Sequence, residues 1–193
     1  MILFGDIEEN KLFEDEIFED ADLEKTEFKK CVFRNCRFLS STFYNCEFNN
    51  VCFENSDLSN IKFDKSILYK SKFKNSKSEG TSFIDSNFNS VSFSDSVFRY
   101  ANFANSNFKD SEFTKADLKN SIFSDCNFKK MIFNECNLIS SEFFKTILNT
   151  IDFTTCEIDG ILVSPELLKG VIVTNNQAVE LAKLMGIIVI GNC

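Results

Sequence analysis

The sequence predicts an all-β solenoid in which the chain turns a corner every five residues. The first observation is a five-residue register that begins at Phe13 and continues without a slip to Val163. Of its 31 positions, 22 are Phe and 6 are Leu, and Ser78 alone is polar. A second register, two residues earlier, carries small or apolar residues and never a charge at its 29 positions from Ala21 to Ile161. Two inward positions in every five fit neither the period of a helix nor that of a strand.

The five-residue units share one pattern: a small residue, a polar residue, Leu or Phe, and two polar residues. The units include CVFRN, CRFLS, STFYN, CEFNN, SNFNS, ANFAN, SNFKD, ADLKN and CNFKK. This pattern resembles the consensus of the pentapeptide-repeat family over roughly residues 11–165. The resemblance implies a right-handed quadrilateral parallel β-helix with about 20 residues in each coil. The register would then make about 7.75 coils and a rod ~37 Å long.

Residues one coil apart should stack, so the register predicts ladders of inward side chains. One ladder consists only of phenylalanine, whose ring buries a large apolar area. Ser78 interrupts the ladder that contains Leu58 and Phe98, and two interpretations stay open there. The first is a local packing defect or small bulge, and the second is a coil that projects a recognition feature. The all-phenylalanine ladder comprises Phe13, Phe33, Phe53, Phe73, Phe93, Phe113, Phe133 and Phe153.

A solenoid exposes apolar side chains at both ends and needs caps. We therefore expect an N-terminal cap over residues 1–12, the β-helix over 13–163 and a helical cap over 164–193. Pro165 begins a short turn, Thr174 to Gln177 resembles a capping box that opens a helix, and Gly186 ends that helix. The apolar run 187–190 is expected to form a buried strand.

The C-terminal stretch GVIVTNNQAVELAKLMGIIVIG carries more apolar surface than one end of a square coil needs to bury. It is similar to the C-terminal module of the quinolone-resistance (Qnr) pentapeptide proteins, which dimerise through it. The resemblance implies a tail-to-tail homodimer. The expected dimer residues are Ala178, Leu181, Ala182, Leu184, Met185, Ile187 and Ile188.

The composition argues against catalysis. The chain has no His, which is the commonest general base and transition-metal ligand. Its six Gly are scattered, so no phosphate-binding loop is present, and no CxxC motif indicates zinc. Six of the eight Cys occupy the inward small-residue register and are explained as apolar fillers. We expect a protein that is not an enzyme and has no catalytic residues, metal, cofactor or small-molecule substrate.

The formal net charge is -8, and this charge is unevenly placed. The face through Phe18 and Ile158 is the most acidic, the face through Phe28 and Phe128 is net basic, and lysines cluster between 62 and 77. An acidic rod whose aromatic residues are committed to its core is not expected to bind nucleic acid. The expected partner-binding residues are Glu16, Glu19, Asp20, Asp57, Asp117, Glu157 and Asp159.

Two functions are compatible with these features. The Qnr-like resemblance implies a DNA-mimic rod that binds a type II topoisomerase, DNA gyrase or topoisomerase IV, and modulates it or protects it from quinolones. The alternative is a structural or scaffolding module with another protein partner. The N-terminus lacks a basic segment followed by a long apolar one, and no apolar run reaches membrane-spanning length. We therefore expect a cytoplasmic protein that does not enter a membrane and keeps its cysteines as thiols.

Overall fold

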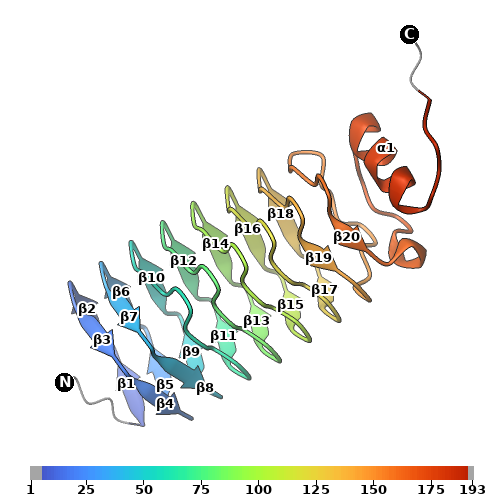
Figure 1. Cartoon of the computed structure of the whole chain (residues 1–193). Coiled ribbons are helices and arrows are strands. Elements are labelled where there is room, and N and C mark those ends of the chain that lie inside the picture. The colour runs from blue at the N-terminus through green and yellow to red at the C-terminus, as the bar shows by residue number, and fades with distance from the viewer. Residues whose placement is uncertain (1–5, 191–193) are drawn as a thin grey trace.

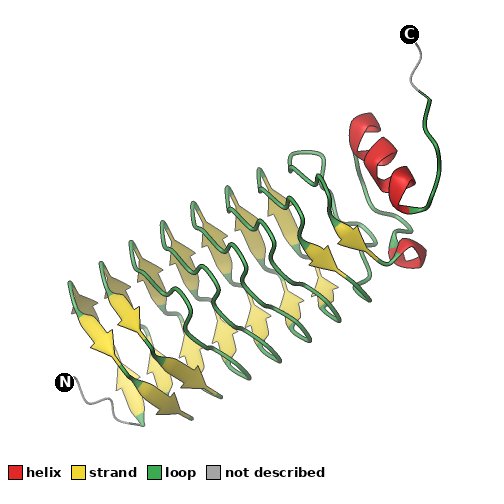
Figure 2. Ribbon diagram, viewed as in Figure 1, coloured by secondary structure: helices red, strands yellow, loops and turns green. Residues whose placement is uncertain are grey.

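The chain winds into an elongated rod with its first strands at one end and a helix at the other (Figure 1). The computed structural model describes residues 6–190. Short strands of two or three residues alternate with corners along the coil, and paired strands are parallel (Figure 2). The quadrilateral parallel β-helix predicted by the sequence is confirmed. We name its four sides after the first inward residue of four consecutive units: the Phe13, Phe18, Leu23 and Phe28 faces.

Two of the four faces are continuous parallel sheets of seven strands. The Phe28 face consists of β1 (Ile7–Glu9), β5 (Glu27–Lys29), β9 (Glu47–Asn49), β11 (Ile67–Tyr69), β13 (Asn87–Asn89), β15 (Asn107–Lys109) and β17 (Asn127–Lys129). The Phe13 face consists of β2 (Leu12–Glu14), β6 (Val32–Arg34), β10 (Cys52–Glu54), β12 (Lys72–Lys74), β14 (Ser92–Ser94), β16 (Glu112–Thr114) and β18 (Ile132–Asn134).

The other two faces begin as paired strands and continue as single bridges. The Phe18 face opens with β3 (Ile17–Glu19) and β7 (Arg37–Leu39). The Leu23 face opens with β4 (Asp22–Glu24) and β8 (Thr42–Tyr44), and ends with β19 (Glu142–Phe143) and β20 (Leu162–Val163). Between these strands the units form tight turns, for example the one closed by the hydrogen bond from Ser121 N–H to Leu118 O at 3.0 Å. Only one residue of each such unit forms β-bridges to the adjacent coils.

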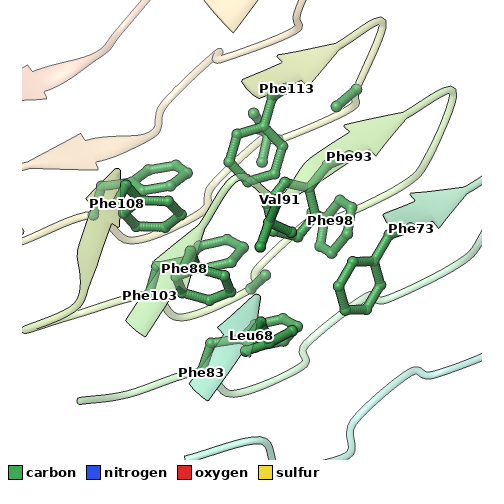
Figure 3. Close-up of a cluster of buried hydrophobic side chains, with 14 of the residues drawn as sticks. Leu68, Phe73, Phe83, Phe88, Val91, Phe93, Phe98, Phe103, Phe108 and Phe113 are labelled. Atoms are coloured by element: carbon green, nitrogen blue, oxygen red, sulfur yellow. The ribbon is translucent and has the colours of Figure 1, made fainter. Parts of the chain in front are cut away.

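Every strand pair joins residues 20 apart, as the stacking of coils requires. In the Phe13 ladder, successive ring centroids lie 4.2–5.8 Å apart. Phe93, for example, stacks on Phe113 and meets Phe98 edge-on at 88° (Figure 3). The core therefore consists of stacks along the rod and edge-to-face contacts across it, the two geometries that aromatic rings prefer. The predicted all-phenylalanine ladder is buried throughout.

The corners depend on a left-handed backbone at the last residue of each unit. From Asn10 to Thr150, 28 described residues other than glycine have φ between 49° and 68°, and all lie at this position. Asn and Asp occupy 15 of these corners, because their short polar side chains tolerate the left-handed region. Thr155 is the exception along the coil. The enrichment of Asn and Asp at the last position thus has a conformational cause.

Serine in the second register has a role beyond its small size. Ser86 Oγ accepts the N–H of Ser66 at 3.2 Å and donates to Phe63 O at 2.9 Å. Ser106 repeats both bonds one coil later, with Ser86 and Phe83. These hydroxyls therefore satisfy buried backbone groups at the corners, which would otherwise lose their hydrogen bonds to water.

The coil keeps its five-residue register at Ser78. Its backbone N–H donates to Val97 O at 2.7 Å, and neighbouring Lys77 bridges to Asp57 and Val97 in the adjacent coils. The side chain is fully buried, and its hydroxyl has no hydrogen-bond partner. The structure thus shows a packing defect without a bulge, and the alternative of a projecting recognition feature is wrong. The regular backbone bonds explain this, because they depend little on the inward side chain.

The C-terminal cap consists of the 3-10 helix Pro165–Leu167 and helix α1 (Asn175–Leu184). The predicted capping box is present, since Thr174 and Gln177 exchange their side-chain and backbone bonds at 2.8 and 3.3 Å. Gly186, with φ of 78°, follows the helix as predicted. The buried strand predicted at 187–190 is wrong: this segment is exposed and pairs with no described strand. It follows α1, away from the strands of the last coil (Figure 1).

The coil begins earlier than the predicted boundary at residue 13. Strand β1 pairs with β5 and places Glu8 at an inward position of the Phe28 face. The Glu8 side chain is buried and forms an ion pair with Lys11. An inward charge at the end of a stack disfavours the addition of another strand there. The first five residues of the predicted N-terminal cap lie outside the described part of the chain.

Candidate protein-interaction surface

The first described coil accounts for the whole net negative charge of the chain. Residues 6–24 contain 10 of the 29 acidic side chains and only one of the 21 basic ones. The rest of the chain is therefore close to neutral. A charge concentrated at one end of a rod produces a local negative potential, which attracts a basic partner surface.

Six acidic residues of this coil form no ion pair within residues 6–190, and we call the five of them between residues 15 and 22 the acidic tip. Strand β3 and the corners around it place them where the Phe13, Phe18 and Leu23 faces meet. Ile17, at the centre of this surface, is 57% exposed. An apolar side chain surrounded by unpaired carboxylates suits a protein partner with basic and apolar groups. The acidic tip consists of Asp15, Glu16, Glu19, Asp20 and Asp22.

The structure separates the predicted partner-binding residues into two groups. Glu16, Glu19 and Asp20 belong to the acidic tip, whereas Glu157 and Asp159 lie seven coils away, about 34 Å along the rod. The two residues between these groups are not isolated acids. Asp57 bridges to Arg37 and Lys77 through the backbone, and Asp117 forms an ion pair with Arg99 at 2.6 Å. The Phe18 face is therefore acidic at its ends and mixed in charge between them.

Lysines encircle the coil that contains residues 61–80, and we call them the basic belt. Lys74 pairs with Glu54 at 3.2 Å, and Lys65 lies over the Tyr44 ring at 5.2 Å from its centroid. The belt lies two coils from the tip at Lys62 and three coils from it at Lys77, or about 10–14 Å. It ends the acidic surface after a few coils, so the rod does not carry a continuous DNA-like potential. The belt comprises Lys62, Lys65, Lys70, Lys72, Lys74 and Lys77.

The C-terminal cap exposes apolar side chains as well. Leu181 is buried against the coil and Ala182 is half-buried, so these two predicted dimer residues mainly dock α1 onto its own chain. The other five predicted dimer residues are exposed, and the most exposed, Ile188, is accessible to 88%. These five are Ala178, Leu184, Met185, Ile187 and Ile188.

The described part of the chain contains few groups suited to chemistry. No group of three or more potential metal ligands occurs within residues 6–190. Burial raises the pKa of the Cys126 thiol to about 12 and that of Cys46 to about 11, so both are neutral at physiological pH. No described helix is long and apolar enough to cross a membrane.

The fold, the repeat and the charged surface define a class of solenoid proteins built from five-residue units. The family described as "pentapeptide repeat region" matches residues 11–83, 46–121 and 103–181. The chain therefore belongs to the pentapeptide-repeat family, whose members are generally structural or interaction modules. No curated protein sequence matches the chain.

Several solved structures are similar to this chain. One is a trypsin-treated variant of QnrB1, a plasmid-mediated fluoroquinolone resistance protein, with 21% identity over 96% of this chain and 99% of that chain and a TM-score of 0.47. HetL of the cyanobacterium Nostoc, which is involved in heterocyst differentiation regulation, has 11% identity over 86% and 91% and a TM-score of 0.43. A pentapeptide-repeat protein of the Arabidopsis thaliana thylakoid lumen has 26% identity over 51% and 66% and a TM-score of 0.40.

Proposed function

We propose that the protein is a non-catalytic, cytoplasmic rod that binds a type II topoisomerase, DNA gyrase or topoisomerase IV, through its acidic tip. The observation that carries this proposal is the charge distribution: the first coil holds the excess of acid, while the rest of the chain is nearly neutral. A topoisomerase binds DNA phosphates with basic surfaces, which a cluster of unpaired carboxylates complements. The Qnr-like C-terminal module supports the same partner class.

The DNA mimicry in this proposal is local. The basic belt begins two coils from the tip, at Lys62, so only the first coils present the carboxylates that imitate phosphates. The coil also carries no projecting loop between Asp6 and Val163, because the units keep their register there. We therefore expect binding to occur with weak protection from quinolones.

Supercoiling and cleavage assays with gyrase and topoisomerase IV, with and without ciprofloxacin, test this function. The expected result is inhibition of supercoiling or reduced drug-induced cleavage at micromolar protein, together with a gel shift of the enzyme. If neither enzyme shows a change in supercoiling, cleavage or mobility, the topoisomerase proposal fails.

The uninterrupted coil favours a second candidate, a scaffold that binds another protein. Its polar faces alternate in charge along the rod, as at Asp57, Lys77 and Asp117, and such a pattern suits a partner that lies along several coils. The two candidates differ in the site of contact. Cross-linking to a topoisomerase that maps to the tip supports the first, whereas cross-links spread along the rod to another protein support the second.

We also propose that two chains associate through their C-terminal caps. The exposed apolar side chains after Gly186 support this, because a soluble protein rarely leaves a contiguous apolar run in water. Light scattering should give the mass of a dimer, and Ile188→Asp should give that of a monomer. Ile147→Asp, at a position 62% exposed outside the cap, is the matched control and should remain dimeric. A monomeric wild type at micromolar concentration would refute the dimer.

A further inference from the structure

Cys136 and Cys156 occupy the same inward position in two successive coils. Asn137 and Glu157, the residues that follow them, form a parallel bridge, and Glu157 N–H donates to Cys136 O at 2.9 Å. Residues paired in this way lie about 4.8 Å apart. This spacing falls within the range of about 4.4–6.8 Å between Cα atoms that a disulfide bond requires. The backbone thus brings these two thiols within reach of each other.

No other described cysteine is stacked on a second cysteine. The inward residues one coil after the other four core cysteines are Val51, Ser56, Ser66 and Thr146. Cys136 and Cys156, in contrast, are stacked directly on each other. The interaction between these neighbouring thiols lowers the pKa of Cys156 and raises that of Cys136, so Cys156 ionises first. The pair therefore contains one thiol suited to nucleophilic attack and a second thiol beside it.

The corner before Cys156 differs from the other corners of the coil. Thr155 lacks the left-handed backbone, and its Oγ1 accepts the N–H of Glu135 at 3.0 Å. The same oxygen lies 4.0 Å from Cys156 Sγ. Cys156 itself is 7% exposed, and Thr155 is its neighbour toward the surface. A surface hollow of about 220 Å³ opens there, lined by Met131, Ile132, Phe133, Asn134, Thr150, Asp152 and Thr155.

We propose that Cys136 and Cys156 form a redox-active thiol pair that a hydroperoxide converts into a disulfide. The Cys156 thiolate attacks a peroxide oxygen, which breaks the O–O bond, gives a sulfenic acid and releases water after protonation. Cys136 Sγ then attacks Cys156 Sγ, and the hydroxyl leaves as water with the Cys136 proton. With hydrogen peroxide, two thiols are oxidised to one disulfide and one peroxide is reduced to two waters.

The disulfide would act on the C-terminal cap. Gln177 Nε2 donates to Cys156 O at 2.8 Å, so the corner that carries this cysteine also holds helix α1. A bond between the sulfur atoms fixes this corner to the preceding coil. Oxidation should therefore slow the detachment of α1 from the coil. A disulfide of this kind is compatible with a reducing compartment, where such bonds are transient and sense oxidants.

The test is a peptide map of the full-length protein after brief exposure to a modest excess of hydrogen peroxide. The remaining thiols are alkylated before digestion without reductant. The expected result is a fall from eight free thiols to six and one linked peptide that joins Cys136 to Cys156. Hydrogen exchange at the backbone amides of α1 should slow in the oxidised protein and recover on reduction.

The controls are three single Cys→Ser substitutions. Serine fits the inward positions of the coil, since Ser76 and Ser96 are buried at equivalent positions. Cys136→Ser and Cys156→Ser should each abolish the linked peptide, and Cys136→Ser should accumulate oxidised Cys156. Cys126→Ser, at a buried cysteine stacked on Thr146, should retain the linked peptide. The proposal is overturned if eight thiols survive, if Cys156 stays unoxidised in Cys136→Ser, or if the linked peptide contains another cysteine.

Discussion

The Gln177 side chain donates from Nε2 to Phe153 O at 2.8 Å. The same nitrogen reaches Cys156 O at 2.8 Å, while Oε1 accepts the N–H of Thr174 at 2.8 Å. One amide therefore completes the capping box of α1 and also binds the helix to two carbonyl groups of the last coil. This arrangement leads to our first prediction, which concerns the docking of the cap.

Gln177→Ala should release α1 from the coil. The substitution removes both bonds to the coil, each worth about 0.5–1.5 kcal/mol, and the reciprocal bond of the capping box. We expect hydrogen exchange of the α1 amides to accelerate by about tenfold or more, while exchange in β10 to β16 is unchanged. Gln177→Glu keeps the acceptor for Thr174 and loses the donor. Exchange at the wild-type rate in the Glu variant would show that the contacts to the coil do not hold the helix.

Two buried serines provide the second prediction. Ser76 Oγ accepts Ser56 N–H at 3.1 Å and donates to Phe53 O at 3.3 Å, whereas Ser78 Oγ has no partner. Ser76→Ala should lower the free energy of unfolding by about 1–2 kcal/mol, because it leaves buried backbone groups unsatisfied. Ser78→Ala should leave it unchanged or raise it. Urea unfolding measures both.

Ser78→Leu should raise the free energy of unfolding by about 1–2 kcal/mol, since it adds apolar area to a ladder that contains Leu58 and Phe98. The regular backbone at Ser78 gives the new side chain the same direction as its neighbours. Binding to a partner should not change. A loss of stability would mean that the ladder has already closed around the serine.

The phenylalanine core gives the third prediction. Phe93 stacks on Phe73 at 5.0 Å and on Phe113 at 4.2 Å and is fully buried. Phe93→Ala should cost about 3–5 kcal/mol in unfolding free energy, because it leaves a cavity in the middle of the rod. Phe93→Leu should cost markedly less, since leucine occupies the equivalent position at Leu68 and Leu118 in other ladders. Equal losses of unfolding free energy for the two variants would contradict a core that is stabilised by buried apolar area.

The fourth prediction concerns alkaline pH. Burial raises the pKa of Cys126 from 9.0 to about 12 in the folded protein. As pH rises above about 9, the unfolded chain loses this proton before the folded chain does. The resulting stabilisation is complete below pH 9 and is lost progressively as pH rises toward 12.

Urea unfolding at pH 8 and pH 10.5 measures this effect. Wild type should lose about 2 kcal/mol more between the two pH values than Cys126→Ala, in which the titrating group is absent. Lysine and tyrosine titrate in both proteins, so the comparison isolates the thiol. The same loss in both proteins would show that Cys126 is not buried as a neutral thiol.

The sequence determined the coil because its five-residue register is nearly unbroken, and the register fixed both the stacking and the core. It also predicted the capping box at Thr174 and the glycine that ends the helix. The hydrogen bonds of Ser86 and Ser106 were not predicted, because a small residue at a corner suggests packing before it suggests bonding. In contrast, the frequent Asn and Asp at the last position of the units did indicate a left-handed backbone at the corners.

The interaction surface was harder to predict. Face membership was correct for Asp57 and Asp117, but the Arg99 side chain forms an ion pair with Asp117, and this contact depends on rotamers. The strand expected at 187–190 failed because apolar residues alone do not provide a strand with a hydrogen-bonding neighbour. The role of the surface charges and of the exposed apolar segment 187–190 depends on contacts with other molecules. The five-residue repeat does not encode those contacts.

The central claim is that the acidic tip binds a type II topoisomerase. Its most direct test is the affinity of gyrase or topoisomerase IV for two matched double variants, measured at two salt concentrations. Glu19→Gln with Asp20→Asn neutralises the tip, and Glu157→Gln with Asp159→Asn removes the same charge from the other end of the same face. The account predicts about three- to tenfold weaker binding and a smaller salt dependence for the tip variant alone. Equal affinities of the two variants, or no binding by the wild type, would contradict it.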